Sequence, residues 1–245
     1  MTGPVHLILD EPPHSGAWNM AVDAALLEEA LNSGMTFVRL YRWAEPTISL
    51  GYFQKPGEHA ADLRFRHLPC VRRLSGGGAI LHDCEQTYSC VLPPGHHLAE
   101  QPSELYGLMH SVVIDLLKDR GIALAPRGRD SKKSAEPFLC FLREASPDLV
   151  LHGHKVLGSA QRRRRGAVLQ HGSLLLGSSA SVPELLGLSE LAPAFQWSQQ
   201  DAAELGRQMG HALGGELITG ELPDSVRSAA LPFHKRSDLP SRCSA

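Results

Sequence analysis

A run of three glycines beside two arginines is the first segment that could carry chemistry. Glycine permits positive φ and lets backbone N–H groups approach a ligand closely. Arginine can hold a carboxylate or a phosphate. A tight strand connection with surface arginines explains the same residues equally well. It is not a Walker loop, because no Gly-Lys-Ser/Thr follows. The segment consists of Arg72, Arg73, Leu74, Ser75, Gly76, Gly77 and Gly78.

A lysine and a cysteine are the next candidates. Lys155 opens an apolar strand of small residues, 155–161. Facing a pocket, its ammonium could polarise a thioester carbonyl or meet a phosphate, whereas a lone lysine more often extends along the surface to solvent. Cys140 lies between Leu139 and Phe141, which are the surroundings of an inert core thiol. Residue types alone therefore leave both roles open.

Two histidines lie in polar stretches. His82 precedes Asp83, but neighbouring strand residues point to opposite faces, which disfavours a simple acid–base dyad and leaves a polar turn as the alternative. His171 follows Gln170 inside an apolar strand, so both side chains need partners if they are buried. Residues 171–175 lack the Gly-x-Ser-x-Gly pattern of serine hydrolases.

The spacing of apolar residues predicts the elements that would position these side chains. Glycines at 153 and 166 mark turns between the last three predicted strands, which favours an antiparallel meander. The irregular order of helices and strands favours an α+β fold with a mixed or antiparallel sheet. We expect helices over 15–31, 103–120, 183–191 and 201–213. We expect strands over 7–9, 37–43, 47–53, 71–74, 79–82, 87–92, 148–151, 155–160 and 167–176.

Composition excludes several classes of protein. The chain has 245 residues, 42% of them hydrophobic, which suits an ordinary globular core. A net charge of −2 gives no general attraction to nucleic acid or to a membrane surface. The five cysteines form no CxxC pair, so we expect reduced thiols and no metal site. With no signal-peptide pattern and no long apolar run, we expect a cytoplasmic protein without nucleic-acid or membrane partners.

Four ordered stretches together resemble the lipoate–protein ligase and octanoyltransferase family, which shares its catalytic fold with biotin–protein ligases. They are residues 19–23, 72–83, 155–162 and 166–173. The resemblance implies a mixed sheet flanked by helices, with a single acyltransferase domain over 1–221 and a polar C-terminal tail over 222–245. It also implies that the substrate-binding residues are Arg72, Arg73, Ser75, Gly76, Gly77, Gly78, His82, Gly158, Ser159, Ala160, His171 and Gly172.

The family includes three related chemistries. Ligases activate lipoate with ATP as an acyl-adenylate. Octanoyltransferases take octanoate from acyl carrier protein through a cysteine thioester, and amidotransferases move the acyl chain between carrier domains, also through cysteine. Cys140 with Phe141 precedes Lys155 and resembles the nucleophile pair of one octanoyltransferase branch. The resemblance therefore implies that Cys140 is the nucleophile and that Lys155 contacts the activated acyl group.

Further residues separate the transferase from the ligase. Ligases more often have Gly-Asn after His-Asp, whereas Cys84 follows Asp83 here. The stretch after Gly177 is short for the C-terminal accessory domain of many ligases. Gly78 instead favours the ligase, because a glycine at this position is commoner in ligases. Ala24 departs from the pattern of the whole family, which usually has glutamate there.

The transferase is the function that we expect from these residues. It would move octanoyl from octanoyl-acyl carrier protein to a lysine of the lipoyl domains of 2-oxoacid dehydrogenases or of the glycine cleavage H protein, with no cofactor. An ATP-dependent lipoate–protein ligase, which would use ATP and Mg²⁺, is the alternative. A non-catalytic binder of acyl groups or carrier proteins is a third possibility.

Overall fold

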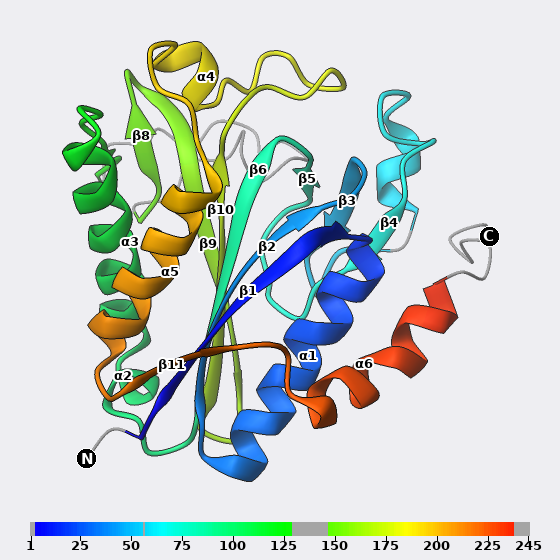
Figure 1. Cartoon of the computed structure of the whole chain (residues 1–245). Helices are drawn as coiled ribbons and strands as arrows, with labels where there is room; N and C mark the ends of the chain where they lie inside the picture. Colours follow the sequence, from blue (N-terminus) through cyan, green and yellow to red (C-terminus); the bar gives the residue numbers. More distant parts are fainter. Residues whose placement is uncertain (1–2, 56, 129–146, 238–245) are drawn as a thin grey trace.

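A large mixed sheet forms the centre of the molecule (Figure 1). The computed structural model describes residues 3–55, 57–128 and 147–237. Within these residues eight strands form the large sheet, in the order β11 (Leu217–Gly220), β1 (Val5–His14), β2 (Thr36–Trp43), β6 (Glu85–Leu92), β10 (Ala167–Leu175), β9 (His154–Arg164), β8 (Leu149–Leu151) and β7 (Ala125–Pro126). The first three strands are parallel and the following pairs are antiparallel. The α+β fold with a mixed sheet is confirmed.

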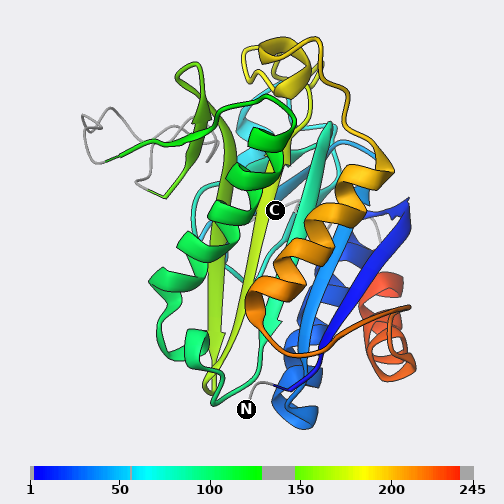
Figure 2. The same cartoon turned by 60° about the vertical axis from the view of Figure 1, so that its left-hand side comes forward.

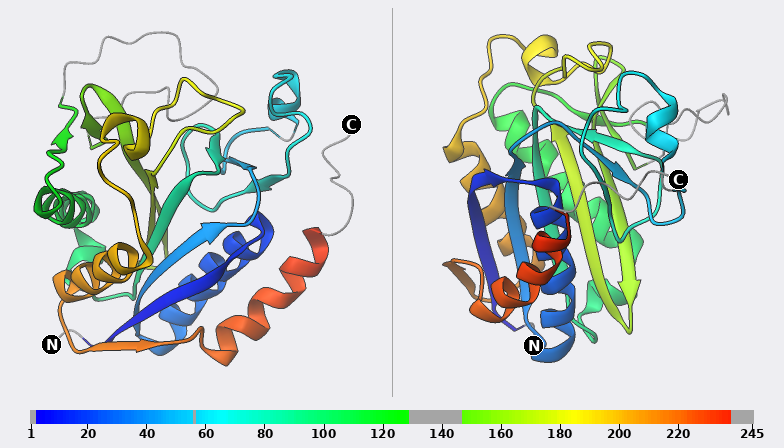
Figure 3. Two further views of the ribbon diagram at one scale, coloured as in Figure 1. Left: turned by 45° about the horizontal axis from the view of Figure 1, so that its top comes forward. Right: turned by 90° about the vertical axis from the view of Figure 1, so that its right-hand side faces the viewer.

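A second, smaller sheet lies beside the large one. Among the described strands it contains β4 (Cys70–Arg72), β3 (Thr47–Leu50) and β5 (Ile80–His82), in that order. The glycine-rich segment connects β4 to β5, and a loop with a short 3₁₀ helix, η1 (Glu58–Ala61), connects β3 to β4. Figure 3 shows this small sheet at one end of the molecule, next to the strands β6 and β10.

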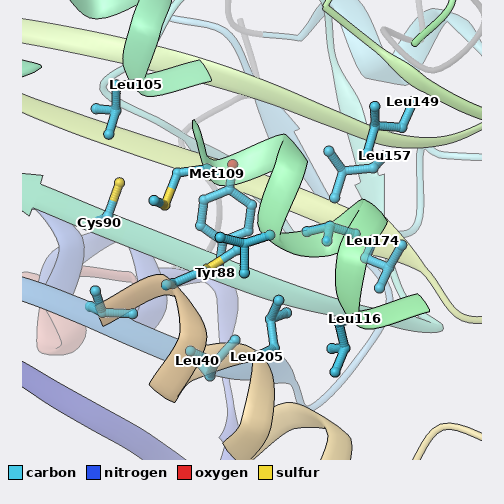
Figure 4. Packing of buried hydrophobic residues seen from close by; sticks show 14 of the residues in the cluster. Leu40, Tyr88, Cys90, Leu105, Met109, Leu116, Leu149, Leu157, Leu174 and Leu205 are labelled. Atoms are coloured by element: carbon cyan, nitrogen blue, oxygen red, sulfur yellow. The ribbon is translucent and has the colours of Figure 1, made fainter. Parts of the chain in front are cut away.

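Helices cover both faces of the large sheet (Figure 2). One face packs against α1 (Gly16–Ser33) and α6 (Asp224–Ser237), and the other against α3 (Pro102–Asp119) and α5 (Gln199–Leu213). Two short helices, α2 (His97–Glu100) and α4 (Leu188–Leu191), lie in connecting segments. Period-2 alternation along the strands divides the buried apolar residues between the two faces, and the larger cluster lies under α3 and α5, as Figure 4 shows for Tyr88, Met109 and Leu205.

Local sequence signals explain the main elements. Ser15 caps α1, because its hydroxyl accepts a hydrogen bond from the Trp18 N–H, and Gly34 ends the helix in the left-handed conformation. The predicted antiparallel meander is confirmed as β8, β9 and β10, with Gly153 and Gly166 at its turns.

The structure corrects two expectations near the C-terminus. Only residues 188–191 of the predicted helix over 183–191 are helical. The region expected to be a polar C-terminal tail over 222–245 contains α6, whose Val226 and Ala230 are buried against the α1 side of the sheet. These two residues lie four apart on one helix face, and the helix-disfavouring Pro232 and the serines nearby hid this pattern.

The described helices are not membrane spans. None of those between residues 3 and 237 combines sufficient length with sufficient apolar character to cross a bilayer.

Candidate active site

A cavity of about 350 Å³ lies where the glycine-rich segment and β5 meet α1, α3 and the strands β9 and β10. This volume falls in the usual range for small-molecule sites. Its lining contains ten of the residues that the sequence suggested: Arg73, Gly76, Gly77, His82, Lys155, Gly158, Ser159, Ala160, His171 and Gly172. In the described part of the chain, Arg72, Ser75 and Gly78 do not line it. Cys140 lies outside the described residues.

Lys155 is held at this cavity by a buried ion pair. Its Nζ lies 3.0 Å from the Asp148 carboxylate, and both side chains are about 4% exposed. Gly158 makes room for the lysine, because a Cβ at that position would lie 2.7 Å from the Lys155 Cε atom. A buried charge requires such a partner. The site therefore contains a fixed lysine amine beside a stretch of small residues.

Arg73 organises the glycine-rich segment. It is 1% exposed. Its Nη2 donates hydrogen bonds to the carbonyl oxygens of Gly76 and Gly78, at 2.8 and 2.6 Å, and its Nη1 donates to the Ser49 carbonyl at 2.7 Å. The buried guanidinium therefore ties the segment to the neighbouring strand β3 and fixes the backbone that lines the cavity.

Arg72 points away from the cavity. Its exposed guanidinium donates hydrogen bonds to the backbone carbonyls of Gly51, Tyr52 and Gln54. The guanidinium therefore holds the loop after β3 rather than a group inside the cavity. Sequence could not distinguish the two arginines by type, and their alternation along the chain places them on opposite sides.

His82 belongs to a buried polar cluster at the cavity wall. Its Nδ1 lies 2.8 Å from Glu85 Oε1 and its Nε2 lies 2.7 Å from Ser49 Oγ, while its ring stacks on Trp43 at 3.8 Å. Burial lowers the pKa of His82, although Glu85 opposes the shift. Burial alone would raise the pKa of Glu85, but the charge and hydrogen bond of His82 hold it below its usual value. The acid partner of His82 is thus Glu85, three residues away, and not Asp83.

His171, like His82, lies between a serine hydroxyl and a carboxylate. Its Nε2 lies 2.5 Å from Ser75 Oγ, and its Nδ1 lies 3.5 Å from Asp23 Oδ2 on α1. Asp23 also accepts hydrogen bonds from Arg39, Tyr41 and Ser89 at 3.0 Å each. Burial would raise the pKa of Asp23, but the hydrogen bond of His171 and the charge of Arg39 lower it overall. Ser75 therefore connects the glycine-rich segment to β10 through His171.

The cavity also contains residues that the sequence reasoning missed. Asp148 and Tyr106 lie beside Lys155 and Ser159, and Met20 from α1 contributes an adaptable apolar side chain. Met20 lies in one of the stretches that carry the family resemblance, which was the available signal. Asp148 and Tyr106 are residue types that are common in cores and on surfaces, and only the tertiary structure brings them to the cavity. The remaining lining residues are Tyr41, Ile80, Thr87, Gln161 and Ser173.

Cys84 and Cys90 are unfavourable nucleophiles. Burial raises the pKa of Cys90 to about 12. Burial and the negative charge of Asp83 raise the pKa of Cys84, which is exposed but does not line the cavity. A thiol with a raised pKa is almost entirely protonated near neutral pH.

The described residues contain a second cavity but no group of side chains that could hold a metal ion. Residues 3–55, 57–128 and 147–237 contain no cluster of three or more His, Cys, Asp or Glu side chains able to hold a metal ion. A larger hollow of about 530 Å³ lies between the ends of β1 and β2 and the start of α5. It is lined by Leu9, Pro12, Arg42 and Trp197 among others and contains none of the predicted site residues. The chemistry-bearing side chains therefore converge on the smaller cavity.

Comparison with known proteins places these features in a family. The model of the lipoyl protein ligase A/B catalytic domain matches residues 15–198. An octanoyltransferase LipM from Carboxydothermus hydrogenoformans is 40% identical over 174 residues, which cover 69% of this chain and 64% of that protein, so the match spans less than two thirds of that relative's length. An octanoyltransferase LipM from Kyrpidia tusciae is 31% identical over 249 residues, covering 88% of this chain and 90% of the relative.

Solved structures have the same fold. A lipoate–protein ligase A bound with ATP superimposes with a TM-score of 0.74 and 20% identity, covering 99% of this chain and 98% of the other. The bipartite lipoate protein ligase of Thermoplasma acidophilum gives a TM-score of 0.70 and 18% identity over 96% of this chain and 93% of the other. This chain therefore shares the fold of these ligases. This chain belongs to the lipoyl protein ligase A/B catalytic domain family.

Proposed function

We propose that this protein is an octanoyltransferase that moves an octanoyl group from acyl carrier protein to a lysine of lipoyl domains. The observation that carries the proposal is the buried Lys155–Asp148 pair in a cavity walled by the glycine-rich segment. The relatives named octanoyltransferase LipM support it, because they are 31–40% identical over much of the chain.

Two thioester-dependent steps account for the reaction. The thiolate of Cys140 attacks the carbonyl carbon of the donor thioester, forming a new C–S bond, and the pantetheine sulfur leaves and takes up a proton. The amine of the acceptor lysine then attacks the acyl-enzyme, forms the amide C–N bond, loses one proton and releases the cysteine thiol. The first step exchanges one thioester for another and is close to isoenergetic, and the second converts a thioester into a more stable amide, so neither step needs a nucleotide.

The described residues fit this chemistry. A fixed ammonium at Lys155 is suited to stabilise the oxyanion of each tetrahedral intermediate. Arg73 keeps Gly76, Gly77 and their backbone in place along the cavity, and Met20 and Ile80 supply apolar contacts for an acyl chain. Lipoyl domains are the acceptors that we propose, and the reaction requires no cofactor from the protein.

We expect octanoyl transfer to proceed without nucleotide. The purified protein is incubated with octanoyl-acyl carrier protein and an unmodified lipoyl domain, with and without ATP and Mg²⁺, and the mass of the lipoyl domain is followed. Modification at the same rate in both mixtures is the expected result. A strict requirement for ATP together with free octanoate or lipoate would establish the ligase instead. Binding of the donor without any modification would identify a non-catalytic binder.

We expect Gly77→Val to weaken use of the acyl donor. Gly77 has φ +92° at the rim of the cavity, a conformation that a β-branched residue avoids. Strain of this kind costs on the order of 1–3 kcal/mol and should displace the segment, raising the donor KM by about tenfold or more. Steady-state kinetics against donor concentration measure this change.

Gly95→Val is the matched control for this variant. Gly95 has φ +82° in an exposed turn with no atom near its Cβ position. The same backbone strain should lower the stability of the Gly95 variant without changing the donor KM. An unchanged KM in a folded Gly77→Val protein would contradict the placement of the donor.

A further inference from the structure

A line of four buried side chains joins Arg73, which holds the glycine-rich segment, to the Glu85 carboxylate on β6. Arg73 Nη1 lies 3.2 Å from Ser49 Oγ, and Ser49 Oγ lies 2.7 Å from His82 Nε2. On the other side of the ring, His82 Nδ1 lies 2.8 Å from Glu85 Oε1. Each of the four side chains is at most 5% exposed. Among these four described residues, Arg73 and His82 line the cavity and the other two do not.

The direction of each hydrogen bond follows from the two charged ends. Burial would raise the pKa of Glu85, but its contacts with His82 lower it overall. An ionised carboxylate cannot donate, so the His82 Nδ1 atom carries the hydrogen that it shares with Glu85. Burial lowers the pKa of His82 despite the opposing charge of Glu85, so the ring is neutral and its Nε2 accepts from the Ser49 hydroxyl. Ser49 Oγ in turn accepts from Arg73, because a guanidinium only donates.

All three hydrogen bonds therefore run the same way, from the Arg73 cation to the Glu85 anion. Buried hydrogen bonds aligned in this way polarise one another, which strengthens each of them. The neutral side chains of Ser49 and His82 thereby link two buried charges of opposite sign. Such a link offsets part of the cost of burying each charge.

The ring of His82 is fixed in the middle of this line. It stacks on the Trp43 indole with 3.8 Å between the ring centroids and 7° between the planes. The indole Nε1 donates to Thr87 Oγ1 at 2.8 Å, and Thr87 donates to the same Glu85 oxygen that His82 contacts, at 2.5 Å. The plane, the place and the tautomer of the imidazole are therefore all set by described neighbours.

Arg73 passes this order on to the segment. Its Nη2 donates to the carbonyl oxygens of Gly76 and Gly78 at 2.8 and 2.6 Å. We propose that His82 is a positioning residue, which holds the Ser49 hydroxyl, thereby aims the Arg73 guanidinium and so sets the glycine-rich backbone along the cavity. The consequence for the acyl donor rests on the proposed function, whereas the effect on the segment does not.

Two substitutions remove the same hydrogen bond from its two ends. Ser49→Ala removes the hydroxyl and leaves the backbone carbonyl in place. In His82→Asn the amide nitrogen takes the place of Nδ1, which keeps a donor for Glu85 and removes the acceptor for Ser49. Thr47→Val is the matched control, because it removes another buried hydroxyl of β3, one that bonds a backbone carbonyl two residues earlier.

The first readout is amide hydrogen exchange of the peptide that contains residues 76–78, followed by mass spectrometry without any substrate. We expect about fivefold faster exchange in Ser49→Ala, as the loss of one buried hydrogen bond implies, and wild-type exchange in Thr47→Val. His82→Asn should exchange at least as fast, and the double variant no faster than His82→Asn alone, because both changes remove one shared bond. Wild-type exchange in Ser49→Ala, or effects that multiply in the double variant, would overturn the proposal.

The second readout needs no variant. Nitrogen NMR of the wild-type histidine rings should show His82 with hydrogen on Nδ1 and no titration as the pH falls through about 6.5, where a free histidine titrates. Hydrogen on Nε2, or titration near 6.5, would overturn the proposal even if both variants failed to fold.

Octanoyl transfer gives the catalytic consequence. Because the segment lines the cavity, Ser49→Ala should raise the donor KM about fivefold and leave kcat near the wild-type value. Thr47→Val should change neither constant. An unchanged donor KM in Ser49→Ala, beside an active wild type, would overturn the role of His82 at the donor site. A wild type that transfers no octanoyl but gives the expected exchange and spectra would refute the proposed function and leave the role of His82 in the segment intact.

Discussion

Replacing Cys140 with alanine should abolish octanoyl transfer, lowering its rate on the order of 10³-fold or more. The reason is chemical, because without the thiol there is no acyl-enzyme, and a direct attack by the acceptor lysine must do the work of both steps. The rate of lipoyl-domain modification at saturating donor measures this loss. The assignment of Cys140 comes from its resemblance to the nucleophile of one octanoyltransferase branch, since it lies outside the described residues.

Cys84→Ala is the control for that variant. Cys84 is exposed, and its thiol has a raised pKa because of partial burial and the nearby Asp83 carboxylate. The Cys84→Ala protein should therefore modify the lipoyl domain at the wild-type rate. Full activity in Cys140→Ala would remove the cysteine mechanism and shift the interpretation to the ATP-dependent ligase.

Lys155→Ala should slow both half-reactions by about 10²-fold, the usual scale for the loss of one electrostatic group that stabilises an oxyanion. The buried Asp148 carboxylate would also lose its partner, 3.0 Å away in the intact protein. An unpaired buried charge destabilises the fold. Single-turnover rates of acyl-enzyme formation and of transfer to the acceptor measure the two steps separately.

Lys118→Ala serves as the comparison. Lys118 is exposed near the end of α3, outside the cavity lining, and its removal should change neither rate. The double variant Lys155→Ala with Asp148→Ala removes both charges and should recover stability without recovering the rate. A Lys155→Ala protein with both half-reactions at the wild-type rate would remove the lysine from the mechanism.

The sequence predicted the elements whose signals are local. The helix expected over 15–31 is α1, which Ser15 and Gly34 bound, and the glycines at 153 and 166 lie at the turns of the predicted antiparallel meander. The helix α6 was missed because, among its side chains whose burial is described, only Val226 and Ala230 are buried, within a segment rich in serine. Such a short apolar face gives a weak periodic signal in the sequence, and packing against α1 supplies the remaining stabilisation of the helix.

The candidate site was predictable only in part, because the sequence does not reveal the side-chain directions and strand pairing that tertiary packing fixes. Lys155, His82 and His171 do converge on one cavity, as their motifs suggested. Arg72 and Ser75 lie in the same motif as Arg73, but the side-chain direction of each depends on how the glycine-rich segment folds back on β3 and β10. Asp148 became a partner of Lys155 through pairing of β8 with β9, which no spacing rule reveals before the register is known.

Intact-protein mass spectrometry shows directly whether Cys140 carries the octanoyl group. The wild-type protein is mixed with octanoyl-acyl carrier protein in the absence of nucleotide and acceptor, and the product is then mapped by peptide. We expect a mass increase of one octanoyl group on the peptide that contains Cys140, and its loss when an unmodified lipoyl domain is added. No adduct, or an adduct on Cys84 or Cys90, would contradict transfer through a Cys140 thioester.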